Sequence, residues 1–294
     1  MSGVSTHGEQ LLERVLERAE RMLEQLETRL PPSRVPADWS APAYRWRRPG
    51  VLKPVHHPHR VEMDNLLGID DQKAELARNT EQFVRGLPAN NVLLWGSRGT
   101  GKSSLIKAML TRYADDGLRL VEVDKQDLVD LPDIVDPLRE RPERFVLFSD
   151  DLSFEANDPS YKALKATLDG SVAAAPDNVL IYATSNRRHL LPEYMSDNEN
   201  TRVMDGEIHH GEAVEEKISL SERFGLWLSF YPFDQDHYLE IVFRYLDLLE
   251  VPVADAHEAR QAALRWALAR GSRSGRVAWQ FARDYAGRHL GGAA

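Results

Sequence analysis

Apolar and polar positions divide the chain into parts of different texture. From Gly8 to Leu30, apolar residues recur at helical spacing among Glu and Arg, which predicts an amphipathic helix. The Pro-rich stretch from Pro36 to His59 cannot hold a helix, so we predict an extended arm there. The first 60 residues are therefore expected to form an N-terminal helix plus a basic arm.

After residue 60 the pattern changes to short apolar runs separated by helical repeats, which is typical of a parallel sheet covered by helices. The predicted strands are Asn91 to Trp95, Leu118 to Val123, Phe145 to Ser149, Val179 to Thr184 and Leu226 to Tyr231. From Asp234 onward three helices and no strand are predicted. The expected fold class is α/β, a three-layer parallel sheet sandwich over residues 61–233 followed by an all-helical unit over 234–294.

Composition limits the class of protein. Hydrophobic residues make up 42% and charged residues 28%, which excludes collagen-like and wholly disordered chains. The absence of Cys excludes disulfides and thiolate chemistry and suits a reducing compartment. No apolar run is long enough to cross a bilayer, and the start lacks a signal-peptide pattern. We therefore expect a cytoplasmic protein without membrane contact.

One octapeptide carries the strongest chemical signal. It follows the phosphate-loop pattern of Gly, four residues, Gly, Lys and Ser, and reads Gly96, Ser97, Arg98, Gly99, Thr100, Gly101, Lys102 and Ser103, with Ser104 next. Its backbone amides would surround a β-phosphate, while Lys102 neutralises phosphate oxygens and Ser103 offers a hydroxyl to Mg²⁺. A Gly-rich turn that binds nothing is the alternative. The apolar run before the loop and the helical pattern after it favour phosphate binding.

Polar side chains also follow two predicted strands. Asp150 and Asp151 come directly after Phe145 to Ser149, and Asn186 follows the next strand. We predict that Asp150 holds Mg²⁺ largely through water, that Asp151 polarises the attacking water, and that Asn186 orients it. A solvated acidic pair and an Asn that caps a turn are the alternatives.

Two arginines are candidates for contacting the terminal phosphate. Arg223 precedes the last predicted strand and would stabilise charge there, in its own subunit or in a neighbouring one. Arg276 opens the last helix and would reach nucleotide from the helical unit. For each of them an ordinary surface charge is the alternative.

Taken in order over Val61 to Leu290, these features resemble the AAA+ ATPase superfamily. The resemblance assigns Leu67 and Gly68 to the adenine pocket, residues 96–103 to Walker A and residues 145–151 to Walker B. It makes Asn186 sensor 1, Arg223 an arginine finger and Arg276 sensor 2 in a helical lid. Asp151 stands where most members carry Glu. In this Asp-Asp form the chain is similar to bacterial initiator and helicase-loader ATPases. The whole combination looks most like a bacterial AAA+ family of unknown function.

This resemblance implies ATP and Mg²⁺ as cofactors and a homo-oligomer joined through Arg223. The expected function is an ATPase that couples ATP to the remodelling or loading of an unknown protein partner. One alternative is a nucleic-acid-associated switch, because residues 41–60 contain five Arg or Lys and no acid, and the lid is rich in Arg. The other is a scaffold that binds ATP without cleaving it. The acidic segment 195–216 has no predicted role.

Overall fold

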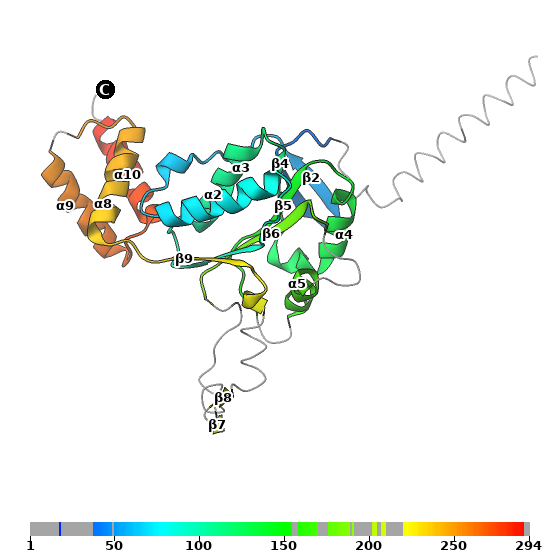
Figure 1. The fold of residues 1–294 in the computed structure, drawn as a ribbon. Helices are drawn as coiled ribbons and strands as arrows, with labels where there is room; N and C mark the ends of the chain where they lie inside the picture. The colour runs from blue at the N-terminus through cyan, green and yellow to red at the C-terminus, as the bar shows by residue number, and fades with distance from the viewer. Residues whose placement is uncertain are drawn as a thin grey trace, which may run out of the picture.

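A computed structural model describes residue 18 and residues 38–48, 50–154, 158–169, 176–188, 190, 202–204, 207–209, 220–253 and 255–290. Its main feature is a seven-stranded sheet of order β2-β1-β4-β5-β6-β3-β9 (Figure 1). The strands are β1 (Ala43–Arg47), β2 (Val51–Val55), β3 (Val92–Gly96), β4 (Leu118–Glu122), β5 (Arg144–Ser149), β6 (Val179–Ser185) and β9 (Leu226–Phe230). Every neighbouring pair is parallel except β1 with β2. The five predicted strands are confirmed.

Alternate residues of the central strands enter two separate cores, as a sheet covered on both faces requires. Val146 and Phe148 of β5 pack with helices α2 (Asp70–Val84) and α3 (Lys102–Tyr113). Phe145 and Leu147 pack with α4 (Leu131–Val135) and α5 (Pro159–Asp169) on the other face. The predicted three-layer α/β sandwich is therefore confirmed.

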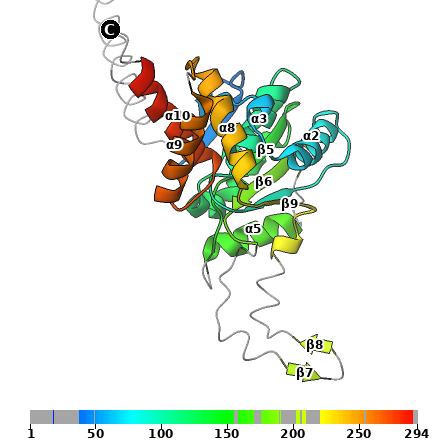
Figure 2. The same cartoon turned by 90° about the vertical axis from the view of Figure 1, so that its left-hand side faces the viewer.

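A helical lid stands beside the sheet and has its own core (Figures 1 and 2). It consists of α8 (Gln235–Leu248), α9 (Ala256–Ala269) and α10 (Gly275–Leu290), which confirms the three predicted helices. Asp234 and Asp255 begin α8 and α9 by accepting hydrogen bonds from first-turn backbone amides. Leu67 and Phe233 pack against the lid core from outside it, so the lid is attached where the nucleotide is expected.

Short elements complete the described part. Single 3₁₀ turns are η1 (Met63–Asn65), η2 (Lys125–Asp130) and η3 (Asp136–Leu138). Within the acidic segment 195–216, β7 (Arg202–Met204) and β8 (Glu207–His209) pair as an antiparallel hairpin. The predicted helix from Gly8 to Leu30 lies outside the described residues, apart from Arg18.

The predicted extended arm is wrong over residues 43–55, which form β1 and β2. Strand β1 pairs in parallel with β4 and antiparallel with β2, where Trp46 lies opposite Leu52. Both side chains are buried, and the Trp46 indole N–H donates to Asp130 at 3.1 Å. Pro54 is tolerated because β2 is an edge strand. The hairpin therefore adds two strands to the five that were predicted.

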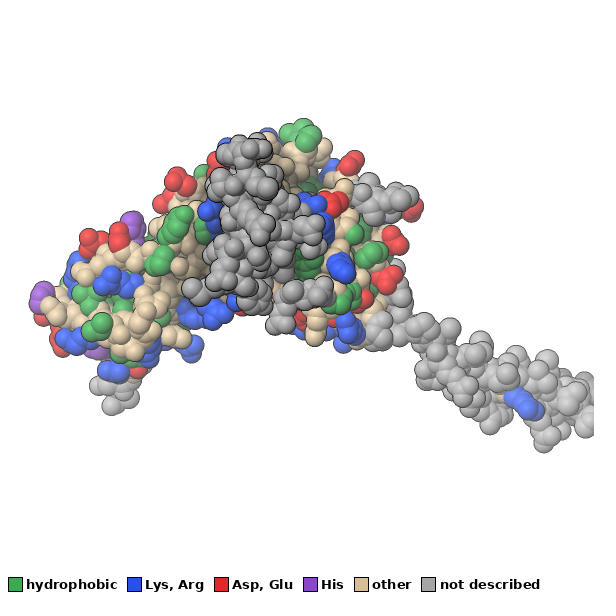
Figure 3. All heavy atoms as spheres, turned by 90° about the horizontal axis from the view of Figure 1, so that it is seen from below, with side chains coloured by type: hydrophobic (Ala, Val, Ile, Leu, Met, Phe, Trp, Pro, Cys, Tyr) green, Lys and Arg blue, Asp and Glu red, His purple; other side chains and the backbone are tan. Residues whose placement is uncertain are grey.

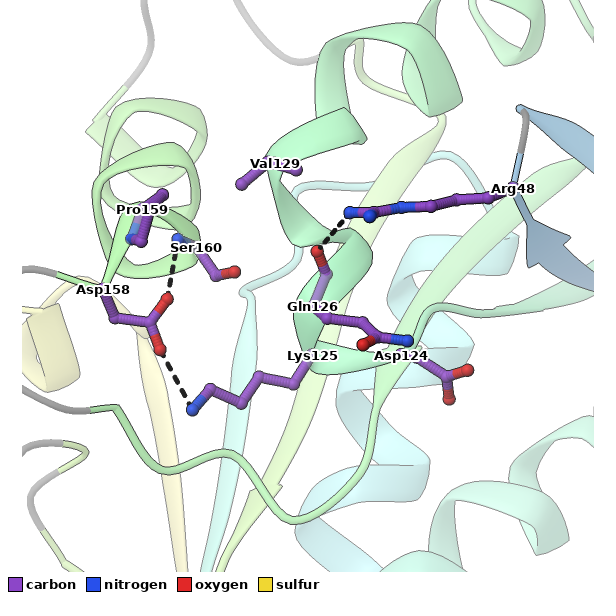
Figure 4. Close-up of a pocket in the computed structure, with 8 residues that line it drawn as sticks. All are labelled: Arg48, Asp124, Lys125, Gln126, Val129, Asp158, Pro159 and Ser160. Atoms are coloured by element: carbon purple, nitrogen blue, oxygen red, sulfur yellow. Dashed lines mark hydrogen bonds and ion pairs between the residues drawn. The ribbon is translucent and has the colours of Figure 1, made fainter.

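Pairing within the domain also occupies the basic side chains of this hairpin. Arg47 is paired with Asp124 at 2.7 Å and Arg48 with Asp127 at 2.9 Å, while Arg45 is paired with Glu122. Figure 4 shows Arg48 reaching the backbone carbonyl of Gln126 beside a small groove of the same domain. Three of the five basic residues in segment 41–60 are therefore paired with acids, while the exposed Lys53 and Arg60 form no ion pair with a described residue.

Candidate nucleotide-binding site

The predicted phosphate loop connects β3 to α3 and depends on its glycines. Gly96, Gly99 and Gly101 all have positive φ, of 128°, 76° and 100°. A Cβ at Gly96 would lie 2.0 Å from the carbonyl oxygen of Phe230, so only Gly lets β9 run this close. The strand–loop–helix context that this motif needs is present, with Lys102 as the first residue of α3.

Lys102 points into the curve of the loop. Its Nζ donates to the carbonyl oxygens of Gly96 at 2.8 Å and Ser97 at 2.7 Å, and to Oδ1 of Asn186 at 3.2 Å. Burial lowers the pKa of Lys102, and the nearby carboxylates of Asp150 and Asp151 oppose this shift. Phosphate oxygens at this position would stabilise the charged form and accept the same three N–H donors.

Ser103 and Asp150 form the oxygen pair expected beside Mg²⁺. The Ser103 hydroxyl donates to Oδ1 of Asp150 at 2.6 Å, and the hydroxyl of Thr184 donates to the same oxygen. The described residues contain no cluster of three or more His, Cys, Asp or Glu side chains. This donor set fits Mg²⁺, which is commonly held by one or two protein oxygens together with phosphates and water.

Asp151 and Asn186 meet on the other side of Lys102. The Asn186 amide donates to Asp151 Oδ1, so this one side chain bridges the lysine and the acid. Asp151 has a positive φ of 54°, and its backbone N–H donates to Thr184 Oγ1 at 2.9 Å. Strained backbone that is held in place by neighbours is frequent at functional sites.

A cleft of about 580 Å³ runs from this loop to the lid. Leu67 and Ile69 line one wall, while Arg276 and the aromatic side chains of Tyr245 and Trp279 line the lid side. Gly68 follows Leu67 in the chain, and a Cβ added at Gly68 would lie 3.1 Å from the ring of Phe233. The cleft has an apolar half suited to a base and a charged half suited to phosphates.

Arg223 is the predicted site residue that lies elsewhere. Its Nε donates to Asp169 at the end of α5, and it does not line the cleft. All other predicted residues lie in the loop, at the adjoining strand ends or around the cleft. Sequence reasoning missed Thr184, the second-last residue of β6, which lies two positions before Asn186. It also missed Tyr245 and Trp279, which line the cleft from α8 and α10.

Residues 39–289 match the model of a family described as "Protein of unknown function (DUF815)". The chain belongs to this family. No curated protein matches its sequence. The family match includes the β1–β2 hairpin, the sheet and the lid, which agrees with a hairpin that is integral to the domain.

Solved structures of mutants of RuvB from Thermotoga maritima have a similar fold. One superposes with a TM-score of 0.51 and a second with 0.50, each at 19% identity over 76% of this chain. The chain spans 63% of the length of these proteins. This likeness concerns the fold alone and agrees with the predicted parallel-sheet sandwich followed by a helical unit. Among the described residues, no helix combines the length and apolarity needed to cross a membrane.

Proposed function

We propose that this protein is a Mg²⁺-dependent ATPase of the AAA+ type. The observation that carries the proposal is the convergence of Lys102, Ser103, Asp150, Asp151 and Asn186 at one edge of the sheet. Parallel strands bring their carboxyl ends to the same edge, where open α/β sheets bind ligands. A Gly-rich turn without a ligand would not need this set of charges.

Binding would use the loop and the lid together. The backbone amides of residues 96–102 surround the β-phosphate, Lys102 bonds the β and γ oxygens, and Arg276 approaches from α10. Leu67 and Trp279 enclose the base. When bound, Mg²⁺ neutralises charge on the β- and γ-phosphates. Ser103 would hold it directly, and Asp150 would hold it largely through water.

Hydrolysis would depend on Asp151 and Asn186. Asp151 accepts a hydrogen bond from the attacking water, while Asn186 holds the Asp151 carboxylate in place and contacts the γ-phosphate side of Lys102. Asp is shorter than Glu by one methylene. The shorter side chain leaves the carboxylate farther from the attacking water, so slow turnover is expected.

Arg223 would complete the site of a neighbouring copy. Its guanidinium lies outside the cleft of its own chain, paired with the half-exposed Asp169. In an assembly that places it at the next γ-phosphate, it would stabilise the developing charge. Hydrolysis coupled in this way to assembly suits an enzyme that remodels or loads a macromolecular partner.

The test is steady-state phosphate release together with native mass, with and without ATP and Mg²⁺. The parent should assemble on ATP, and its turnover per subunit should rise with protein concentration. Arg223→Ala should keep ATP binding and lose turnover, whereas Asp169→Asn, which removes the carboxylate charge beside the same guanidinium, should keep turnover. ATP binding without any phosphate release at high protein concentration would support the scaffold alternative and contradict the ATPase.

A further inference from the structure

A second cleft lies beside the nucleotide site, on the lower face of the molecule where the lid meets the phosphate loop, and shares Thr100 and Phe233 with it. It encloses about 840 Å³ between the outer side of the loop, the segment after β9 and the α9–α10 connection. We call it the basic cleft. It is defined by Ser97, Arg98, Thr100, Pro232, Phe233, Gln235, Gln261, Leu264, Arg265, Ala267, Leu268, Gly271, Ser272, Arg273 and Ser274. Figure 3 shows Lys and Arg side chains gathered over this face of the lid.

All the charged side chains that line the basic cleft are positive. Arg98, Arg265 and Arg273 are all exposed, and no Asp or Glu is among the residues that line it. The acids just after β9 are already engaged, since Asp236 pairs with Arg260 and Asp234 caps α8. Within the described ranges, none of these three arginines is paired with a carboxylate. In a chain of net charge −9, such a concentration of free guanidinium groups selects an anionic partner.

An exposed aromatic side chain, Tyr231, lies next to the wall of the basic cleft. Tyr231, next to Pro232 of the cleft wall, is 67% exposed and contacts Trp95 edge to face at 6.2 Å. Arg188 lies over the ring of Trp95, with 5.7 Å from its guanidinium carbon to the ring centre. Guanidinium groups beside exposed rings bind phosphates and unpaired bases together, which a carboxylate-rich peptide would not need.

We propose that the basic cleft and Tyr231 bind single-stranded nucleic acid. The strand's phosphates pair with Arg98, Arg265 and Arg273, and a base stacks on Tyr231. The occupant would touch the lid and the phosphate loop at once, because the lid connection closely approaches the loop. A Cβ at Gly99 would lie 2.9 Å from Ser274 Oγ. This proposal names the partner of the proposed ATPase and rests on it for the coupling to nucleotide.

The experiment measures fluorescence anisotropy of a labelled 20-residue oligothymidine titrated with the full chain, with and without ATP and Mg²⁺. The parent should bind, and binding should weaken linearly on a log–log plot against salt. Arg265→Gln with Arg273→Gln should bind at least about tenfold more weakly, with a salt slope smaller by about 1.4, the value for two lost phosphate contacts. Tyr231→Ala should bind about fivefold or more weakly without a change in slope.

Matched controls separate this surface from net charge. Arg85→Gln with Arg288→Gln removes the same charge from sites outside the basic cleft and should bind like the parent. ATP affinity, measured separately, should be unchanged in Arg265→Gln with Arg273→Gln. If the parent itself did not bind ATP in this measurement, the ATPase proposal would fail independently of the nucleic-acid result.

Three results would overturn the proposal. The first is no anisotropy change at 50 mM salt in either nucleotide state. The second is equal loss of binding by the cleft variant and its control. The third is displacement of the oligonucleotide by polyglutamate at an equal concentration of charge, which would assign the cleft to an acidic protein.

Discussion

Ser103 in the phosphate loop donates a 2.6 Å hydrogen bond to Asp150, which follows a strand two positions away in the sheet. Thr184, at the end of the strand between them, donates to the same carboxylate oxygen. Three consecutive strand ends therefore converge on one point. This convergence, more than the loop by itself, makes the edge of the sheet suitable for a phosphate-bound metal ion.

Replacing Asp150 tests that metal position. Asp150→Asn keeps an oxygen for Ser103 but removes the charge that would hold Mg²⁺ through water. Nucleotide affinity should fall at least about tenfold in Mg²⁺ and stay unchanged in excess EDTA. Titration with a fluorescent ATP analogue measures both, with the exposed Asp115→Asn as control. An identical Mg²⁺ dependence in Asp150→Asn and the parent would place the metal elsewhere.

Asp151→Asn should separate binding from turnover. The amide keeps the size of the side chain and a hydrogen bond to Asn186, but it cannot accept a proton from the attacking water. ATP affinity should stay within about twofold of the parent, while phosphate release falls about 100-fold or more. Single-turnover hydrolysis at saturating ATP measures the chemical step directly. Full turnover in Asp151→Asn would assign the base to another residue.

Gly99→Ala should show that the lid rests on the phosphate loop. The added methyl would be strained by a φ of 76° and would also meet Ser274 at 2.9 Å. Gly117→Ala is the matched control, since its φ is 92° with no atom within 4 Å of the added carbon. Urea unfolding should show a cost of about 1 kcal/mol for the control and more for Gly99→Ala. Only Gly99→Ala should also weaken ATP binding; equal behaviour of the two would contradict lid contact.

Ionisation of Tyr182 should lower the free energy of unfolding at alkaline pH. Burial raises the pKa of Tyr182 to about 12, and its hydroxyl is hydrogen-bonded to Asn79 at 3.1 Å and to Thr80 at 3.0 Å. Because the folded state favours the neutral phenol, its contribution is complete below the unfolded pKa near 10 and is lost as pH rises from 10 through 12. Tyr182→Phe should cost about 1 kcal/mol at pH 8. It should also reduce the loss of stability between pH 10 and 12, measured by urea unfolding; an unchanged loss would contradict this role.

Local sequence was sufficient to place the predicted phosphate loop between a strand and a helix, and to place Asp150, Asp151 and Asn186 directly after strands. A loop of this kind has fixed spacing, and residues that follow parallel strands must meet at the same edge of the sheet. The apolar runs also located the inner strands β3, β4, β5 and β6, because strands buried on both faces are continuously hydrophobic, and they located the edge strand β9. Thr184 was missed because a hydroxyl at a strand end carries no distinct signal of its own.

The β1–β2 hairpin could not be predicted from its own residues. Arg45 and Arg47 look like an exposed basic arm until their partners are known. These are Glu122, at the end of β4, and Asp124, two residues beyond it, each 77 residues later in the sequence. Pro54 weakened the strand pattern although an edge strand accepts it. Contacts this distant in sequence appear only once the sheet order is known.

The most direct test of the nucleotide site is ATP binding to Lys102→Ala, measured by calorimetry in Mg²⁺ beside the parent and Lys53→Ala, an exposed residue of β2. Removal of the ammonium group that lies inside the loop should weaken ATP at least about tenfold, the effect of losing one charged hydrogen-bonding group. Lys53→Ala should match the parent. If Lys102→Ala bound ATP as tightly as the parent, the loop would not be holding the phosphates.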